Sequence, residues 1–362
     1  MIIKSFRAQN FRNIEKCSLE FDSSVNLLLG ENAQGKTNAV EGIYLFARGK
    51  SFRRGDEKDL IRFGTEGFNL FIEYEDKNGK NTLEYAVFGK ERRRKKNGYK
   101  ISRASEMVGN FKAVLFSPDD LTLVKGGPEE RREFLNVAIS QCFPSYISVY
   151  SDYKKALENR NALLKAASKG LYFDESELSA WSLSLAEYAS DIYIQRLDYI
   201  KKLEVYAKSF MYDISEGKEE LSFEYKTDIE FVSDSSKEQI KSEYARIFKE
   251  NIAKERAAGV TLYGPHREDI LIKINGNDSR IFSSQGQQRS IVLSLKMAEG
   301  EVSRELFSEY PVFLFDDVLS ELDERRQNFV LDGMKDRQII ITSCERLRTA
   351  GEVIEVKGGV FG

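Results

Sequence analysis

The sequence is poor in residues on which several common classes of protein depend. Among its 362 residues are one histidine and three cysteines. Cys17, Cys142 and Cys344 are odd in number, far apart and without a CxxC pair, so they predict neither a disulfide framework nor a cysteine zinc site. A histidine-rich metal site is also excluded. A reducing, cytoplasmic location is the simplest interpretation.

Long apolar runs and an excess of one charge are absent as well. The longest apolar runs, such as Val25–Leu29 and Val312–Phe315, are far shorter than the ~20 residues that cross a bilayer. The N-terminal segment lacks the apolar stretch of a signal peptide. Lys and Arg number 55 against 58 Asp and Glu, for a net charge of −3. We therefore expect no membrane partner, and any anionic partner must meet local basic patches.

The composition of the chain and the spacing of its apolar residues predict a folded core in two parts. Apolar residues make up 41% of the chain, with 24 Phe and 17 Tyr, which supplies ample buriable surface. Strand-like runs and short helices occur at both ends, whereas helical spacing dominates the middle. We predict an α/β head built from residues 1–125 and 262–362, with an inserted, mostly helical lobe over residues 126–261.

A phosphate-binding loop is the strongest motif. Residues 30–37 read GENAQGKT and match GxxxxGK[ST], with a predicted strand before them and a predicted helix after them. In such a loop the backbone N–H groups point at phosphate oxygens, the lysine reaches the β- and γ-phosphates, and the hydroxyl faces Mg²⁺. The alternative is a glycine-rich turn with a solvated lysine. We expect nucleotide contacts from Gly30, Glu31, Asn32, Ala33, Gln34, Gly35, Lys36 and Thr37.

A buried strand that ends in two carboxylates predicts the second half of the site. The apolar run Val312–Phe315 is followed directly by Asp316 and Asp317. We expect Asp316 to join Thr37 in the Mg²⁺ shell, as in other phosphate-loop ATPases, and Asp317 to orient or deprotonate the attacking water. Lys36, Asp316 and Asp317 are thus the candidate catalytic residues.

A polar loop before a helix is similar to the signature loop of ABC-type ATPases. The segment reads SSQGQQ over residues 283–288, and Ser284, Gly286 and Gln287 match that pattern. In this class the loop caps the γ-phosphate held by a second subunit, and the N-terminus of the helix adds positive potential. Residues 320–323, SELD, follow the acidic strand at the spacing of a D-loop. The alternative is an ordinary polar loop before a helix.

With these motifs in this order, the chain resembles the RecF family of bacterial recombination-mediator ATPases, which are related to SMC-type heads. The resemblance covers the whole length. The segments that carry it are Asn10–Asn13, Gly30–Asn38, Phe116–Leu121, Lys125–Arg132, Gly264–Arg267, Ser283–Gln288 and Asp316–Asp323.

The resemblance implies both a fold and a function. The fold is an ABC-type phosphate-loop ATPase head with a helical lobe, and Arg12 and Asn38 join the nucleotide-binding residues. The function is ATP- and Mg²⁺-dependent: the protein dimerises on ATP, hydrolyses it weakly with DNA dependence, and binds duplex DNA and duplex/single-strand junctions. The resemblance also implies that the protein acts with RecO and RecR to load RecA at gaps during DNA repair and replication.

The chain departs from the ABC pattern at three positions. Asp317 stands where many ABC ATPases have Glu, so we expect slow turnover. The switch histidine near Thr342-Ser343 is missing. No glutamine marks a Q-loop, for which residues 116–121 are the candidate segment. The rival functions are an SMC-like DNA clamp, an ABC transporter ATPase subunit and a phosphate-loop metabolic kinase.

Basic clusters are the candidates for DNA contact. The run of Arg92, Arg93, Arg94, Lys95 and Lys96 is predicted at a hairpin tip, either as a phosphate-binding patch or as a solvated turn. Arg131 and Arg132 open a helix, and three roles stay possible for them: starting the helix, pairing with a neighbouring Glu, or binding DNA. The roles of His266 and Arg267 are likewise open between packing and function. We expect recognition of backbone and shape rather than sequence.

Overall fold

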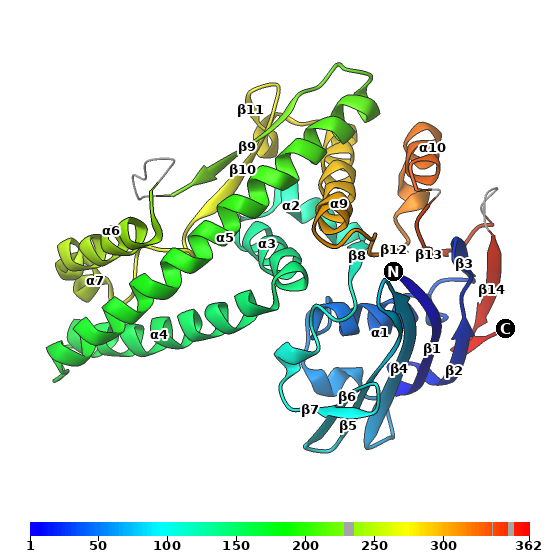
Figure 1. Ribbon diagram of the computed structural model, residues 1–362, viewed down its shortest axis with the longest axis horizontal. Coiled ribbons are helices and arrows are strands. Elements are labelled where there is room, and N and C mark those ends of the chain that lie inside the picture. The colour runs from blue at the N-terminus through cyan, green and yellow to red at the C-terminus, as the bar shows by residue number, and fades with distance from the viewer. Residues whose placement is uncertain (228–234, 335, 347–350) are drawn as a thin grey trace.

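Two six-stranded sheets and a helical lobe make up this computed structural model, which describes residues 1–227, 235–334, 336–346 and 351–362 (Figure 1). The first sheet is antiparallel throughout. Its spatial order is β2 (Ile14–Glu20), β1 (Ile2–Phe11), β4 (Gly67–Asp76), β5 (Gly79–Phe88), β6 (Glu91–Lys96) and β7 (Tyr99–Ile101).

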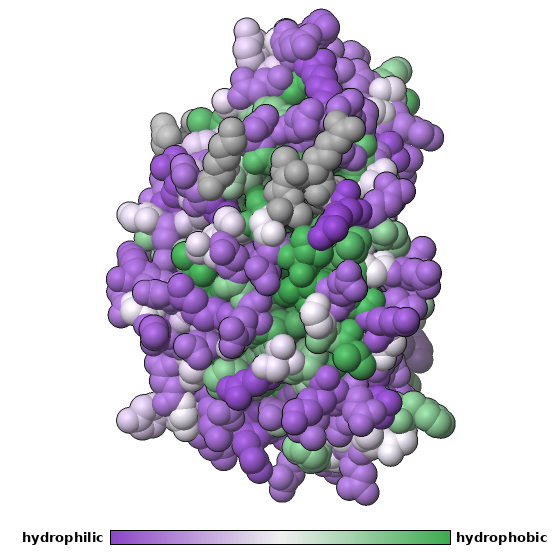
Figure 2. Space-filling model, turned by 90° about the vertical axis from the view of Figure 1, so that its right-hand side faces the viewer, coloured by the Kyte–Doolittle hydropathy of each residue, from purple (hydrophilic) through white to green (hydrophobic). Residues whose placement is uncertain are grey.

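The second sheet is parallel except for one edge strand and combines both ends of the chain. Its spatial order is β15 (Val360–Phe361), β14 (Glu352–Lys357), β3 (Val25–Leu29), β13 (Ile339–Ser343), β12 (Val312–Asp316) and β8 (Ala113–Phe116). Strand β3 therefore lies between two strands from the last part of the chain. This confirms the predicted α/β head with contributions from both ends. The side of the molecule that carries β14 faces the viewer in Figure 2, where hydrophilic residues surround a hydrophobic band.

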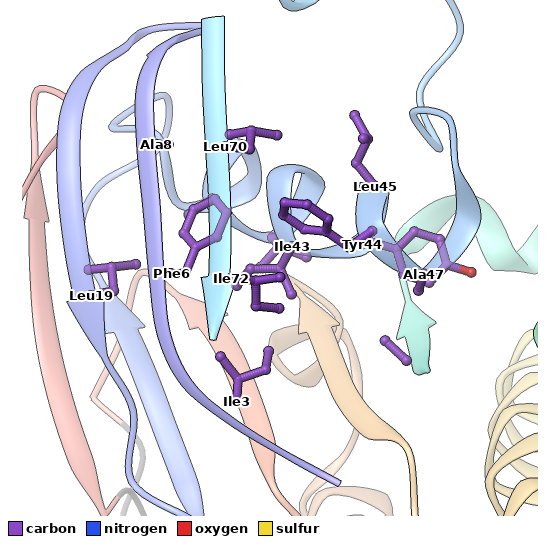
Figure 3. Close-up of a cluster of buried hydrophobic side chains, with 14 of the residues drawn as sticks. Ile3, Phe6, Ala8, Leu19, Ile43, Tyr44, Leu45, Ala47, Leu70 and Ile72 are labelled. Carbon is purple, nitrogen blue, oxygen red and sulfur yellow. The ribbon is translucent and has the colours of Figure 1, made fainter. Parts of the chain in front are cut away.

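Helix α1 (Lys36–Arg48) fills the space between the two sheets. Its apolar side chains share one core with the inner faces of β1 and β4, and Figure 3 shows Ile43 pointing toward Phe6 and Ile72. A Cβ on Gly42 would lie 2.7 Å from Phe6 Cζ, so glycine lets the helix approach the sheet at this point. The core thus fixes α1, and with it the phosphate loop at the N-terminus of the helix.

A helical lobe projects from the head (Figure 1). Its longest member, α5 (Glu175–Ser215), has 41 residues and is about 60 Å long at 1.5 Å per residue. It packs against α4 (Pro144–Ser168) and α6 (Lys237–Glu250), with α3 (Pro128–Cys142) and α7 (Ile252–Ala258) beside them. Asn251 separates α6 from α7. No helix of the described residues is long and apolar enough to span a membrane.

Helix α9 (Gln285–Phe307) joins the lobe to the head. Leu293 and Met297 pack with the parallel sheet and α10 (Glu324–Asp332), whereas Ile291 and Leu295 belong to the core of the lobe. Strand β10 (Asp269–Ile274) pairs with β9 (Leu221–Lys226) and with β11 (Asn277–Asp278), and α8 (Ser279–Phe282) then leads to α9. Because β9 and β10 lie on opposite sides of the predicted boundary at residues 261/262, this small sheet spans it; the boundary itself stays a prediction.

Candidate nucleotide-binding site

The phosphate loop leaves the carboxyl end of β3 and enters α1 in the expected strand–loop–helix order. Ala33 and Gly35 have left-handed backbones, with φ of 63° and 111°, and a Cβ on Gly35 would lie 2.9 Å from Asn13 Oδ1. The first turn of α1 carries no acidic residue, and no side chain caps it. Its N–H groups and the positive end of its dipole can therefore attract an anion.

Lys36 lies almost fully buried under the loop. Its ammonium group donates to the carbonyl oxygens of Gly30 at 2.6 Å and Glu31 at 2.8 Å, and it lies 3.5 Å from Cys344 Sγ. The cysteine thiol in turn donates to Asn32 Oδ1 at 3.0 Å. The ammonium group of the lysine is thus held against the backbone of the loop whose N–H groups would bind phosphate oxygens.

The acidic strand meets the phosphate loop at the same edge of the parallel sheet. Asp316 is the last residue of β12, is buried, and accepts a hydrogen bond from the Thr342 hydroxyl at 2.9 Å. The Thr37 hydroxyl lies near enough to the same carboxylate to lower its pKa. Burial raises the pKa of the Asp316 carboxyl, and the two hydroxyls oppose that rise. Asp317 has a left-handed backbone, with φ of 53°, and its N–H donates to Thr342 Oγ1 at 2.9 Å. Thr342, on the intervening strand β13, therefore contacts both carboxylate residues.

A buried carboxylate that the sequence analysis missed organises the side of α1. Glu41 has no exposed surface and accepts two hydrogen bonds from Arg12, at 2.6 and 3.0 Å, and one from Ser51. Arg53 lies 3.6 Å from Glu41 and donates to Asn38 Oδ1 at 2.9 Å. Arg12 and Asn38, which the family resemblance placed at the nucleotide, thus belong to one network beside the phosphate loop. The sequence feature that could have indicated this network is an acidic residue on the apolar face of a predicted helix.

The signature segment forms the start of α9. Ser284 and Gln287 make a reciprocal capping box, with Gln287 Oε1 accepting from Ser284 N at 2.7 Å. The carbonyl of Gly286 accepts from Arg326 at 3.1 Å, and Arg326 also pairs with Asp323 of the D-loop. In the described part of the chain, no hydrogen bond or ion pair joins residues 283–288 to residues 30–38. The structure therefore couples the signature segment to the D-loop of its own chain rather than to its own phosphate loop.

Residues 116–121, the candidate Q-loop segment, leave the parallel sheet at the same edge as the acidic strand. Phe116, at the end of β8, pairs with Phe315, so Ser117 follows beside the acidic strand. The N–H of Ser117 donates to Asp120 Oδ2 at 2.6 Å, and Asp120 forms an ion pair with the buried Lys296 at 3.4 Å. This segment thus connects the sheet edge to α9 through charged groups, without a glutamine.

The basic run 92–96 is a strand, so the predicted hairpin tip is wrong. Strand alternation divides its side chains between two faces. Three side chains share one face: Arg92 pairs with Glu57, Arg94 lies over the ring of Tyr85, and Lys96 donates to Asn110. On the other face, Lys95 pairs with Glu84. The exposed Arg93 shares the face of Lys95 and has no ion pair among the described residues.

The two arginines that open α3 are held within the protein. Arg131 is buried, and its guanidinium donates two hydrogen bonds to the Asp269 carboxylate, at 2.7 and 2.8 Å. Its ion pair is therefore with a residue 138 positions away rather than with a neighbouring glutamate, and the side chain is not presented to DNA. Arg132 is half-buried and donates to the carbonyl of Glu268 at 3.0 Å.

His266 is half-buried and packs against residues of the lobe. Its Nδ1 is 2.6 Å from the hydroxyl of the buried Tyr153, and its Nε2 is 3.2 Å from the carbonyl of Thr261. Burial lowers the pKa of the imidazole to about 4. These contacts support packing for His266, whereas the neighbouring Arg267 is exposed.

Comparison with known proteins identifies the family. A family model described as the RecF/RecN/SMC N terminal domain matches residues 2–357. The chain is 40% identical over 347 residues to a DNA replication and repair protein RecF from Clostridioides difficile (strain 630), covering 95% of this chain and 92% of that protein.

Solved structures agree with this match. A recombination mediator protein RecF-ATP in the RecFOR pathway superposes with a TM-score of 0.93 at 34% identity, over 100% of this chain and 97% of that one. The Smc head domain of Pyrococcus furiosus shares the fold alone, with a TM-score of 0.56 at 16% identity over 99% of this chain and 95% of that one. The chain therefore belongs to the RecF family of DNA replication and repair proteins and carries the ATP-binding head of that family.

Proposed function

We propose that two copies of this chain bind two ATP molecules between them and, in that state, hold duplex DNA. The observation that carries this proposal is the electrostatic interaction of the Thr37 hydroxyl with the Asp316 carboxylate, which lowers the pKa of that carboxyl. It joins the phosphate loop to the acidic strand across the parallel sheet, which is the arrangement that a phosphate-loop ATPase requires.

The nucleotide would bind along the phosphate loop. The loop N–H groups and Lys36 would hold the phosphates, with Arg12 and Asn38 beside them. The hydroxyl of Thr37 and the carboxylate of Asp316 are hard oxygen donors, which suit Mg²⁺, an ion commonly held by one or two protein ligands together with substrate phosphates. When bound, Mg²⁺ would neutralise negative charge on the phosphates.

Hydrolysis in this proposal is slow and stimulated by DNA. Asp317 would orient the attacking water, but its side chain is one methylene shorter than the glutamate of many ABC ATPases and therefore reaches less far. Its backbone is held by Thr342 at 2.9 Å, so it has little freedom to compensate. We expect single-turnover hydrolysis well below that of a fast ABC transporter.

The signature segment would act on the nucleotide of the second copy. Ser284, Gly286 and Gln287 lie at the N-terminus of α9, whose dipole attracts negative charge. An ATP molecule held between two such surfaces would bridge the subunits, and its hydrolysis would release the bridge and the DNA with it.

Sedimentation with and without ATP tests this arrangement. We expect wild type to dimerise with ATP and Ser284→Arg to stay monomeric while still binding ATP, because the arginine would occupy the place of the partner's γ-phosphate. Ser236→Arg is the matched control, since Ser236 caps α6 through the same Ser-x-x-Gln capping box in the lobe. Dimers of Ser284→Arg in ATP would contradict the trans role of the signature segment.

DNA and partner proteins complete the proposal. The chain would bind duplex DNA and duplex/single-strand junctions in the bacterial cytoplasm and act with RecO and RecR in loading RecA at gaps. Support comes from the family and from the related structure described as part of the RecFOR pathway. On the protein, the exposed face of β6 that carries Arg93 and Lys95, next to Lys100 of β7, is the candidate DNA surface.

A further inference from the structure

The β14–β15 hairpin contacts the phosphate loop directly. The N–H of Gly359, in the turn of the hairpin, donates to the carbonyl of Gln34 at 2.8 Å, and the N–H of Gly358 donates to the side-chain oxygen of the same glutamine. Gln34 lies in the loop between the two left-handed residues Ala33 and Gly35. One residue of the hairpin turn therefore holds the main chain of the loop and another holds a side chain.

The hairpin and the phosphate loop also pack too closely to admit any side chain at Gly30 or Gly359. A Cβ on Gly30 would lie 2.2 Å from the carbonyl oxygen of Val356 in β14, and a Cβ on Gly359 would lie 2.9 Å from the carbonyl oxygen of Asn13. Asn13 in turn donates to the carbonyl of Ala33 at 3.2 Å. The hairpin turn, the β1–β2 turn and the phosphate loop thus form one three-way contact.

The hairpin is itself firmly held. Strand β14 pairs with β3, the strand from which the phosphate loop emerges, through Ile354 opposite Leu28. Glu355 and Gly362 exchange two backbone hydrogen bonds, at 2.8 and 2.9 Å, which close the hairpin. The side chain of Val356 is buried in the core of the head. The turn therefore approaches the loop from a fixed base rather than as a free end.

We propose that the Gly358-Gly359 turn and Gln34 position the phosphate loop for nucleotide, so that the hairpin helps to set the affinity for ATP. A phosphate loop binds through the direction of its N–H groups, and the left-handed backbone of Ala33, next to Gln34, is a conformation that a non-glycine residue keeps only with support from its surroundings. The two hydrogen bonds to Gln34 supply that support from the hairpin turn. The inference rests on the proposed ATP binding and extends it to the hairpin turn, which lies outside the phosphate loop.

Gly359→Ala tests the role of the hairpin, because the added Cβ must push the turn away from Asn13. The matched control is Gly276→Ala: Gly276 has a φ of 76° against 80° for Gly359, but nothing lies within 4 Å of its Cβ position. Both variants carry similar backbone strain, and only one should move the loop. Gln34→Met removes the side-chain acceptor at nearly constant length and provides a second variant.

The measurement is the dissociation constant of a fluorescent ATP analogue with Mg²⁺, together with urea unfolding without nucleotide. We expect Gly359→Ala and Gln34→Met to weaken binding by about five-fold, the effect of roughly one hydrogen bond, while Gly276→Ala binds like wild type. If the two alanine variants unfold at the same urea concentration, weaker ATP binding by Gly359→Ala results from a displaced phosphate loop rather than from a general loss of stability.

The outcomes distinguish this inference from the proposed function. If wild type fails to bind the analogue, the proposed ATP binding is wrong. If wild type binds and Gly359→Ala and Gln34→Met bind equally well, the hairpin does not position the loop. If Gly276→Ala weakens binding as much as Gly359→Ala, strain rather than the contact with the loop is responsible, and the inference is again overturned.

Discussion

The substitution Glu41→Gln should destabilise the head, because it removes one charge from a buried ion pair. Glu41 has no exposed surface and accepts from Arg12 twice and from Ser51 once. The amide has the same size but replaces one acceptor oxygen by a donor group. Leaving a buried charge without its partner costs about 3–5 kcal/mol. Since the Arg12 side chain is 18% exposed and water can partly solvate it, we expect the lower end, about 3 kcal/mol.

Urea unfolding followed by circular dichroism measures this loss. Fluorescence is unsuitable, because the single tryptophan, Trp181, lies in α5 of the lobe and would not report on the head. Glu133→Gln is the control: its carboxylate accepts from Arg48 and pairs with Lys50, but it is 38% exposed. We expect Glu133→Gln to lose less than about 1 kcal/mol.

A double-mutant cycle decides whether the ion pair is responsible. Arg12→Met removes the guanidinium that donates to Glu41, so in the combined variant only the more exposed Arg53 lacks its carboxylate partner. The combined variant should therefore be no less stable than Glu41→Gln alone. A loss below about 1 kcal/mol for Glu41→Gln, or strictly additive losses in the double variant, would refute the reasoning.

Two further predictions concern the lobe and the DNA surface. Because the pKa of His266 falls from 6.5 to about 4 on folding, the unfolded chain binds an extra proton between these values, and stability should fall as the pH falls through this window. The loss should reach about 2 kcal/mol by pH 5; His266→Asn should remove it in urea titrations, and an unchanged pH profile would contradict the neutral buried imidazole. Arg93→Glu with Lys95→Glu should weaken duplex binding and lower the slope of log K against log salt by about one per lost phosphate contact, whereas Lys249→Glu in the lobe should not; equal slopes in all three proteins would place the DNA elsewhere.

Local patterns carried most of the correct sequence predictions. The phosphate loop, the acidic strand and the helix after the signature segment are each coded within fewer than about 25 neighbouring residues, and each lies where its motif predicts. The order of the motifs also indicated that both ends of the chain meet in one head. These features follow from backbone requirements, such as the glycines of the loop, that a single sequence displays directly.

Contacts between distant residues could not be predicted in the same way. Arg131 pairs with Asp269 across 138 positions, and only the fold brings them together. The basic run 92–96 has none of the apolar alternation that predicts a strand, yet it pairs with β5 on one side and β7 on the other. Glu41 was missed because its partners Arg12 and Arg53 come from separate loops; its place on the apolar face of α1 was a signal, but it did not identify those partners.

The position of β3 has a consequence for synthesis on the ribosome. Its two neighbours in the sheet, β13 and β14, begin at Ile339 and Glu352, far along the chain from the end of β3 at Leu29, so the nucleotide loop is made long before either flanking strand. Such long-range pairing slows folding. A nascent chain should therefore remain unable to bind nucleotide until β13 and β14 have been made, and products terminated before these strands should be inactive rather than partly active competitors.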